Sequence, residues 1–247
     1  MSEQAPAGPG EKLPEWLARN IAGDIAGRRL PAGSMLPAEQ VMTETFGVGR
    51  ASIREALRIL ETQGIISLKR GPGGGPVVAD YTGRDFARVA TLHLQMWGAT
   101  YGDLAESLVV TESQLARFAA ERGRERAPLL RQANVRVRSA SDDEEVRAGF
   151  RQFHELIDLL SGNSVLNLFA SAIRVINRVQ PEWSTVDGYL VSPEGREQTV
   201  AEHEAITSAI GRGHAARAER LMRDHLTRQI AVSTQPADWR DEPVTWS

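Results

Sequence analysis

Two hydrophobic patterns divide the chain. From about residue 84 onwards, apolar residues recur at three- and four-residue spacing, with breaks at glycine, proline and Asn163. This spacing is typical of amphipathic helices. It predicts helices over residues 84–96, 100–121, 127–140, 142–161, 164–178, 193–211 and 215–233. Helices of this length joined by short connections predict an antiparallel bundle.

Residues 13–80 instead combine helices with a short hairpin. Apolar positions at helical spacing predict a helix over residues 15–29, and two further helices flank a glycine-containing turn at residues 46–49. Beyond Gly64, two short apolar runs flank a basic, glycine-rich loop at residues 69–75, which predicts a β-hairpin. The predicted fold class is therefore mainly α: an N-terminal winged helix-turn-helix with a small β-hairpin wing, followed by an all-α antiparallel helical bundle.

The second helix of the helix-turn-helix carries basic side chains on one face. Arg50, Arg54 and Arg58 recur at four-residue spacing, and the opposite face is apolar. Such a helix fits the DNA major groove, where guanidinium groups pair with guanine edges or bind phosphates. Glu55 and Glu61 leave the alternative of an ordinary solvated helix with internal ion pairs. The turn before the helix and the basic hairpin after it favour DNA binding.

Charge and composition narrow the function classes. The chain carries 29 Lys and Arg against 32 Asp and Glu, a net charge of -3, which is unusual for a protein that coats nucleic acid without sequence preference. Residues 28–70 nevertheless hold seven basic and four acidic side chains, so positive charge is concentrated in one module. The absence of cysteine excludes disulfides, thiolate metal sites and thiol nucleophiles. Without a membrane-length apolar run or a recognisable signal peptide, we expect a cytoplasmic protein without membrane contact.

The length suffices for two domains, each with its own core. We expect residues 1–12, rich in Ala, Pro and Gly, to be disordered. Residues 13–80 should form the DNA-binding domain and residues 84–233 an effector-binding and dimerisation domain. The polar tail, residues 234–247, contains two tryptophans and is either loose or covers a neighbouring surface.

Three of the five histidines lie mid-helix in the predicted bundle. His154, His203 and His225 are each flanked by apolar residues at helical spacing, so each can point inward. A single inward histidine is more often a core residue with a hydrogen-bonding partner than a metal ligand. Three histidines on separate helices favour a shared metal site, because bundles build such sites between facing helices. Neutral imidazoles suit Zn, Ni or a similar divalent cation.

The N-terminal domain resembles the winged-helix domain of the GntR family of bacterial transcription regulators. The matching segments occur in the family's order: 30–33, 36–39, 47–50, 53–57, 60–61 and 64–66. The resemblance implies base contacts by the arginines of the second helix and minor-groove contacts by the wing tip. The expected DNA-contacting residues are Gln40, Arg50, Ser52, Arg54, Lys69, Arg70 and Gly71. Gln40 stands where the family often has an arginine, which affects sequence preference more than binding.

Residues 84–232 resemble the FCD domain, the all-helical effector domain of the FadR-like subgroup of that family. The matching segments are 153–154, 161–163, 202–206 and 222–226, and they contain all three histidines. In many members, an aspartate four residues before the first histidine joins the three histidines around a metal that helps to hold a small organic acid. In this chain that position is Phe150. Leu108 stands where the family commonly has an effector-binding arginine.

The expected effector pocket comprises Leu108, Phe150, His154, His203 and His225, with the three histidines as ligands of a divalent metal. Asp158 is either a fourth ligand or a solvated charge, and the second is favoured. Because Leu108 and Phe150 make the lining more apolar, we expect a carboxylate effector with a sizeable hydrophobic body, such as a fatty-type acid, rather than a compact di-acid.

The order of the two domains predicts a ligand-responsive repressor that binds double-stranded operator DNA as a homodimer and is not an enzyme. Effector bound in the bundle would change how the two winged helices of the dimer fit the operator. The alternative is a metal-dependent enzyme with an accessory DNA-binding module, because a three-histidine metal site can activate water. The sequence lacks HExxH spacing, a serine elbow and a phosphate-binding loop. A constitutive architectural DNA-binding protein would not need so large a second domain.

Overall fold

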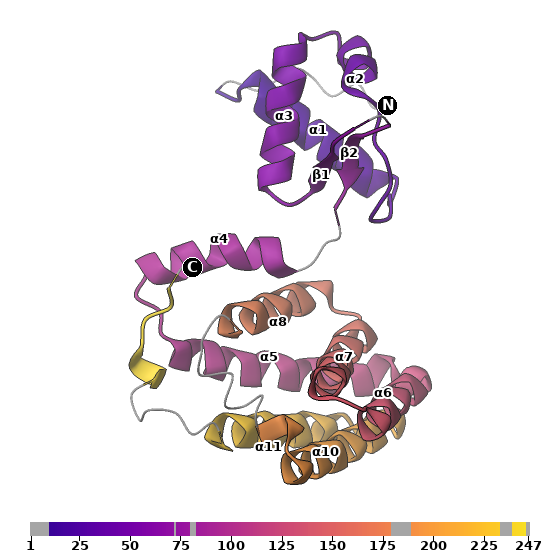
Figure 1. The fold of residues 1–247 in the computed structure, drawn as a ribbon, viewed down its shortest axis with the longest axis vertical. Helices are drawn as coiled ribbons and strands as arrows, with labels where there is room; N and C mark the ends of the chain where they lie inside the picture. Colours follow the sequence, from indigo (N-terminus) through magenta and orange to yellow (C-terminus); the bar gives the residue numbers. More distant parts are fainter. Residues whose placement is uncertain (1–9, 72, 80–82, 179–188, 233–238, 246–247) are drawn as a thin grey trace. The chain divides into compact units, whose positions relative to one another are not determined.

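The fold is that of a computed structural model, which describes residues 10–71, 73–79, 83–178, 189–232 and 239–245 (Figure 1). The chain forms two compact units, Met1–Asp85 and Phe86–Ser247, and each is described by itself. Most of segment 1–12, which we expected to be disordered, lies outside the described residues. No helix in the described ranges is long and apolar enough to cross a membrane.

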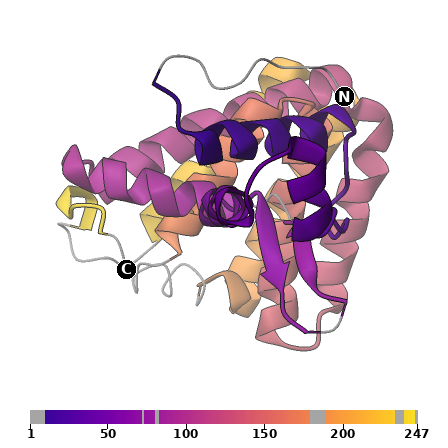
Figure 2. The same cartoon turned by 90° about the horizontal axis from the view of Figure 1, so that it is seen from above.

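The first unit combines helices with a β-hairpin wing. Its elements are α1 (Leu13–Gly27), α2 (Glu39–Phe46), α3 (Arg50–Thr62), β1 (Ile66–Lys69) and β2 (Gly75–Val78). The apolar faces of the helices enclose a core that includes Leu17, Ile53 and Leu57. β1 and β2 pair antiparallel and lie side by side in Figure 2. The predicted winged helix-turn-helix is confirmed.

The strands of the wing lie one residue away from their predicted positions. Ile65, predicted to begin the first strand, instead donates its N–H to the carbonyl of Leu60 and closes the end of α3. Pairing then starts with Ile66 opposite Val78 and ends with Lys69 opposite Gly75. Lys69 is therefore the last residue of β1 and not part of the loop.

Glycines allow the two tight turns of this unit. Gly47 ends α2 with φ 65°, in the left-handed region that favours glycine, and the chain reverses into α3. In the wing, a Cβ on Gly74 would lie 2.3 Å from the carbonyl oxygen of Lys69, which no other residue type can tolerate. The backbone of the wing tip is therefore unusually close-packed.

The second unit is a helical bundle whose helix bounds fall within one residue of those predicted. Its helices are α4 (Gly83–Met96), α5 (Tyr101–Arg122), α6 (Ala127–Ser139), α7 (Asp143–Ser161), α8 (Ser164–Asn177), α10 (Pro193–Gly211) and α11 (Ala215–Val232). The starts of α5, α7, α8 and α10 are fixed by Thr100, Asp142, Asn163 and Ser192, whose side chains accept backbone N–H bonds from the first turn. The long helix α5 packs against α7, α8, α10 and α11, so it occupies the centre of the bundle.

The C-terminal segment covers part of the bundle. A short 3-10 helix, η2 (Trp239–Asp241), is followed by Val244, which is fully buried. Tyr101 donates its N–H to the carbonyl of Glu242, and Val244 donates its N–H to the carbonyl of Ala99. Of the two alternatives for the tail, residues 239–245 thus cover the start of α5. The second tryptophan of the tail, at position 246, lies outside the described residues.

Candidate DNA-binding surface and histidine site

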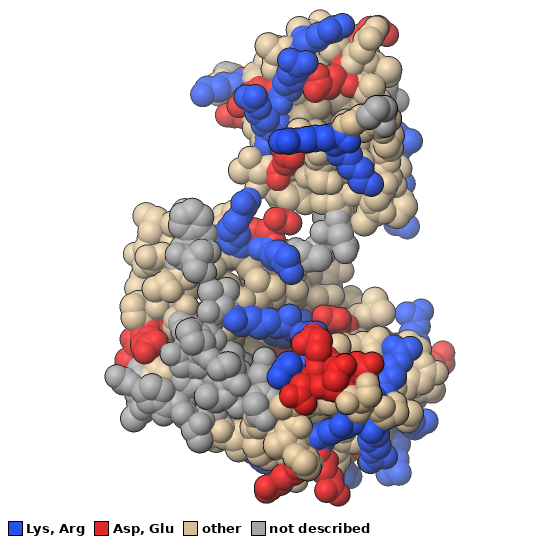
Figure 3. Space-filling view, in the orientation of Figure 1, with Lys and Arg blue, Asp and Glu red and all other residues tan. Residues whose placement is uncertain are grey.

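Helix α3 presents its arginines to solvent. Arg50 is its first residue, and Arg50, Arg54 and Arg58 are all exposed, while Ile53 and Leu57 on the opposite face are buried. Figure 3 shows basic side chains, in blue, over the first unit, with acidic ones, in red, between them. In the described part of the chain, the arginine-bearing face at the start of α3 is therefore open to solvent, as a helix that enters the major groove requires.

Ion pairs within the unit position some of these arginines. Arg54 Nε lies 2.9 Å from Glu39 Oε2, which links α3 to the start of α2. Because this contact uses Nε, it leaves the two terminal nitrogens of the exposed Arg54 side chain available for a bidentate contact. Arg58 pairs more loosely with Glu55, at 3.6 Å. Glu61 makes no arginine pair that the structure describes and accepts the N–H of Leu68 at the base of the wing.

The remaining expected DNA contacts are distributed over α2 and the wing. Gln40 is exposed in the first turn of α2 and donates to Glu44, and Ser52 is half-buried on α3. The wing-tip residues Lys69, Arg70 and Gly71 are all exposed. Gly71 has φ 102°, so the backbone there has a conformation that a side chain would disfavour.

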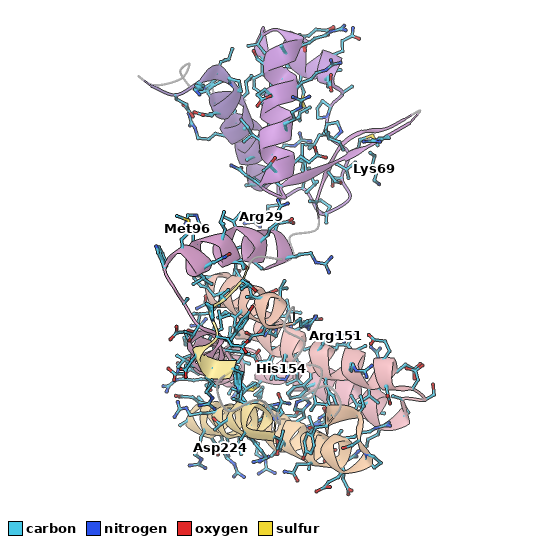
Figure 4. All side chains as sticks on the ribbon, turned by 60° about the vertical axis from the view of Figure 1, so that its left-hand side comes forward. Arg29, Lys69, Met96, Arg151, His154 and Asp224 are labelled. Atoms are coloured by element: carbon cyan, nitrogen blue, oxygen red, sulfur yellow. The ribbon has the colours of Figure 1, made fainter. Side chains whose placement is uncertain are left out.

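The structure brings the three histidines together inside the second unit. His154 of α7, His203 of α10 and His225 of α11 each offer a ring nitrogen, and the three nitrogens lie within 4.8 Å of one another. His203 Nε2 and His225 Nε2 are 3.3 Å apart. Figure 4 labels His154 within the second unit, among the side chains that fill it. His203 and His225 are completely buried or nearly so, and His154 is 9% exposed.

Two of the three imidazoles are hydrogen-bonded to a carboxylate through Nδ1, the ring nitrogen that is not expected to bind a metal. His154 Nδ1 lies 2.5 Å from Glu112 Oε2, and His225 Nδ1 lies 2.6 Å from Glu202 Oε2. A carboxylate at Nδ1 places the proton there and leaves Nε2 with a lone pair, which is the arrangement found behind metal-binding histidines. Burial lowers the pKa of both His203 and His225, and the neighbouring histidines lower it further, so both rings are neutral at neutral pH. These three residues could therefore hold a metal ion.

A half-buried arginine contacts the carboxylate that pairs with His154. Arg174 of α8 contacts Glu112 Oε1 at 2.5 Å and also pairs with Asp158 of α7. Both carboxylate side chains are 3% exposed and that of Arg174 is 14% exposed. Burial opposes the charge on each group. Interactions with His154 and Arg174 nevertheless lower the pKa of Glu112, whereas burial keeps the pKa of Asp158 raised.

One expectation about this site was wrong. Asp158 is not a solvated charge, because it is buried and paired with Arg174. The site also contains a guanidinium group, although Leu108 replaces the arginine expected on α5: Arg174 supplies one from α8. Leu108 and Phe150 are both 4% exposed, and the Phe150 ring stands edge-on to His203 with centroids 5.6 Å apart.

Three residues of the site escaped the sequence analysis, and of these only Arg174 has a recognisable sequence signal. Arg174 is a single cation in an otherwise apolar stretch of α8, where a solvated charge would be out of place. Glu112 is the one charged residue that α5 buries among its described positions. Glu202 directly precedes His203, but its role towards His225 on another helix depends on tertiary packing.

Comparison with known families agrees with both units. Residues 13–75 match the family model for bacterial regulatory proteins of the gntR family, and residues 103–228, about half of the chain, match that for the FCD domain.

The chain belongs to the GntR family of bacterial regulatory proteins and carries an FCD domain.

Named relatives of this GntR-family protein are regulators. It is 25% identical to the HTH-type transcriptional repressor NanR of Enterobacter sp. over 87% of this chain and 83% of that protein. It is 24% identical to the Uxu operon regulator of Haemophilus influenzae over 85% of this chain and 77% of that protein. The solved structure of Streptococcus agalactiae GntR, 22% identical, has the same fold, with a TM-score of 0.62 over 90% of this chain and 100% of that one. The protein is thus a ligand-sensing transcription regulator and not an enzyme.

The buried charges predict a large stability effect at Arg174. Arg174→Met removes the cation and leaves Glu112 and Asp158 buried without a counter-charge, which should lower the free energy of unfolding by about 3–5 kcal/mol. The measurement is urea unfolding of the full chain at neutral pH. Adding Asp158→Asn to this variant should restore part of the loss.

Arg117→Met is the matched control, because Arg117 also contacts two carboxylates, Glu219 and Glu121, but at the surface. This variant should unfold close to the wild type. Equal, small losses in both variants would show that the charge of Arg174 does not support the bundle.

Proposed function

We propose that this protein is a repressor that binds operator DNA as a homodimer and responds to a small carboxylate effector held near a metal in its FCD domain. Residues 13–80 would bind DNA, and residues 84–233 would bind effector and dimerise. The exposed N-terminal turn of α3, within a chain that matches both family models, is the observation that carries the regulator proposal. The name of the NanR relative supports repression. The DNA target implies action in the bacterial cytoplasm.

The proposed DNA contacts divide into base and backbone contacts. Arg50 and Arg54 lie in the first two turns of α3, the part of a recognition helix that reaches base edges. Gln40, Ser52 and the wing residues Lys69, Arg70 and Gly71 would contact phosphates or the minor groove. Arg58 lies two turns from the start of α3 and would contact only the phosphate backbone, not the bases.

Arg54→Ala should weaken binding to the cognate operator by roughly 1–3 kcal/mol and binding to random duplex much less, because a bidentate base contact is lost. Fluorescence anisotropy with both duplexes at one fixed salt concentration measures the difference. Arg58→Ala is the control and should affect both duplexes alike. If Arg54→Ala also affects them alike, Arg54 contacts phosphate only.

We propose His154, His203 and His225 as ligands of a divalent metal of the Zn or Ni type, with Phe150 in place of a fourth protein ligand. Three neutral imidazoles leave a coordination position for water or for an effector carboxylate. The carboxylates behind His154 and His225 support this proposal. When bound, the metal would supply a positive charge that attracts the effector's carboxylate.

Glu202→Gln should weaken metal binding by about 10–100-fold, because the carboxylate that orients His225 is lost. Elemental analysis of purified protein and chelator competition measure this. Glu204→Gln is the control, since Glu204 also neighbours His203 but pairs with Arg138 at the surface. Wild-type protein that takes up no Zn or Ni at neutral pH would rule out the metal site.

The homodimer is proposed because a pseudo-palindromic operator requires two winged helices about one helical turn of DNA apart. Sedimentation equilibrium at micromolar concentration should give twice the mass of 27.1 kDa. A monomer that stays monomeric after operator DNA is added would contradict the proposal.

A further inference from the structure

Two of the clustered histidines are oriented by different kinds of contact. His154 pairs through Nδ1 with Glu112, and Glu112 pairs in turn with Arg174. The ring of His203 instead stacks on Phe153, with centroids 3.6 Å apart. Its Nδ1 has no hydrogen-bonding partner among the described residues. The orientation of His203 thus depends on packing, whereas that of His154 depends on a chain of polar contacts.

The contacts of His225 repeat those of His154, because a carboxylate binds Nδ1 and an arginine binds the carboxylate. Glu202 Oε2 lies 2.6 Å from His225 Nδ1. The other oxygen, Oε1, pairs with Arg228. Gln198, one turn before Glu202 on α10, also donates to Oε1, at 2.6 Å. The described part of the bundle therefore contains two chains of the order His–Glu–Arg.

Glu202 pairs with two residues of the neighbouring helix at once. His225 and Arg228 are three residues apart on α11, so their side chains leave the same side of that helix. Glu202, on α10, pairs with each of them through a different oxygen. A carboxylate whose Oε1 is held has little freedom to turn Oε2 away. Arg228 thereby restricts the position of the carboxylate that orients His225.

The two His–Glu–Arg chains differ in burial. The side chains of Glu112 and Arg174 are 3% and 14% exposed, whereas those of Glu202 and Arg228 are 15% and 43% exposed. Glu202 is therefore close enough to solvent to turn towards water if Arg228 is removed. The same exposure means that a substitution of Arg228 leaves no deeply buried charge without a partner, unlike a substitution of Arg174.

We propose that Arg228 is a positioning residue of the metal site, which holds Glu202 against Nδ1 of His225 and so keeps Nε2 of that ring available to the metal. This inference rests on the proposed function, in which His225 is a metal ligand. A neutral imidazole carries its proton on either nitrogen, and only the Nδ1–H form offers a lone pair on Nε2. A carboxylate at Nδ1 selects this form. Without Arg228, Glu202 turns towards solvent and the two forms mix.

The first readout is the tautomer of His225 in the metal-free full chain at neutral pH, measured from the chemical shifts of the imidazole nitrogens. A His225→Asn variant assigns the signals. The wild type should show the Nδ1–H form and Arg228→Met a mixture of both forms. Arg228→Lys, which keeps a charged donor, should restore the Nδ1–H form at least in part. An unchanged tautomer in Arg228→Met would overturn the proposal.

The second readout is the affinity for Zn, measured by chelator competition. Arg228→Met should weaken Zn binding by roughly threefold to tenfold, the effect of one lost hydrogen bond. Removal of a positive charge would by itself strengthen the binding of a cation. A loss of affinity therefore reports positioning and not charge, and unchanged or stronger binding contradicts the proposal.

Arg223→Met is the matched control, because Arg223 is also exposed on α11 but pairs with Glu219. This variant removes the same charge from the same helix and should leave both the tautomer of His225 and the Zn affinity unchanged. Both variants should unfold close to the wild type, since both ion pairs lie near the surface. Equal losses of Zn affinity in the two variants would show that Arg228 has no specific role.

A double-mutant cycle tests whether Arg228 acts through Glu202. In a Glu202→Gln background, Arg228→Met should weaken Zn binding no further, because the carboxylate that it positions is already lost. A further loss as large as that in the wild-type background would overturn the proposal. Wild-type protein that takes up no Zn or Ni would contradict the metal site itself, whereas the tautomer in the metal-free chain would still show whether Arg228 positions His225.

Discussion

Charge buried in the centre of the bundle is the constraint on which the second unit depends. Glu112 brings a carboxylate from α5, Asp158 one from α7, and Arg174 a guanidinium from α8. None of these charges could remain in a low-dielectric interior without the others. The pairs Glu112–His154 and Glu202–His225 then extend the polar network to α10 and α11. These ion pairs and hydrogen bonds need a specific geometry. They therefore favour one packing of the helices over the others that apolar contacts alone would allow.

The two units use arginine in opposite ways. In the first unit, Arg50 and Arg54 lie at the surface, where water solvates them. The phosphates and bases of DNA can replace that water when DNA binds. In the second unit, the side chain of Arg174 is largely shielded from solvent and pairs with two buried carboxylates, those of Glu112 and Asp158. A chain with a net charge of only -3 can therefore bind DNA with one unit, while the other unit uses the charge of Arg174 to hold two helices to α8.

The sequence was sufficient for the elements and for the histidine cluster because both follow from local rules. Helical periodicity and capping residues such as Thr100 and Asn163 mark helix ends to within a residue. The wing was displaced by one residue because Ile65 bonds back to α3, a contact that strand propensity does not include.

The partners of the site could not be found in this way. The contact of Arg174 with Glu112 joins residues 62 positions apart, and the pairing of His225 with Glu202 depends on how α10 meets α11. The resemblance to the FCD domain was misleading about the guanidinium group. It indicated that an arginine is missing at Leu108, but it did not indicate Arg174 on α8. A side chain's position in a family pattern does not specify which neighbouring helix can supply the same chemical group.

The C-terminal segment makes the end of this chain part of its fold. Val244 fills a buried position, and backbone bonds tie residues 242 and 244 to Tyr101 and Ala99 at the start of α5. Loss of residues 239–245 would uncover the start of the central helix α5. A protein without these residues should therefore be prone to degradation, although His154, His203, His225 and the arginines of α3 are all still present.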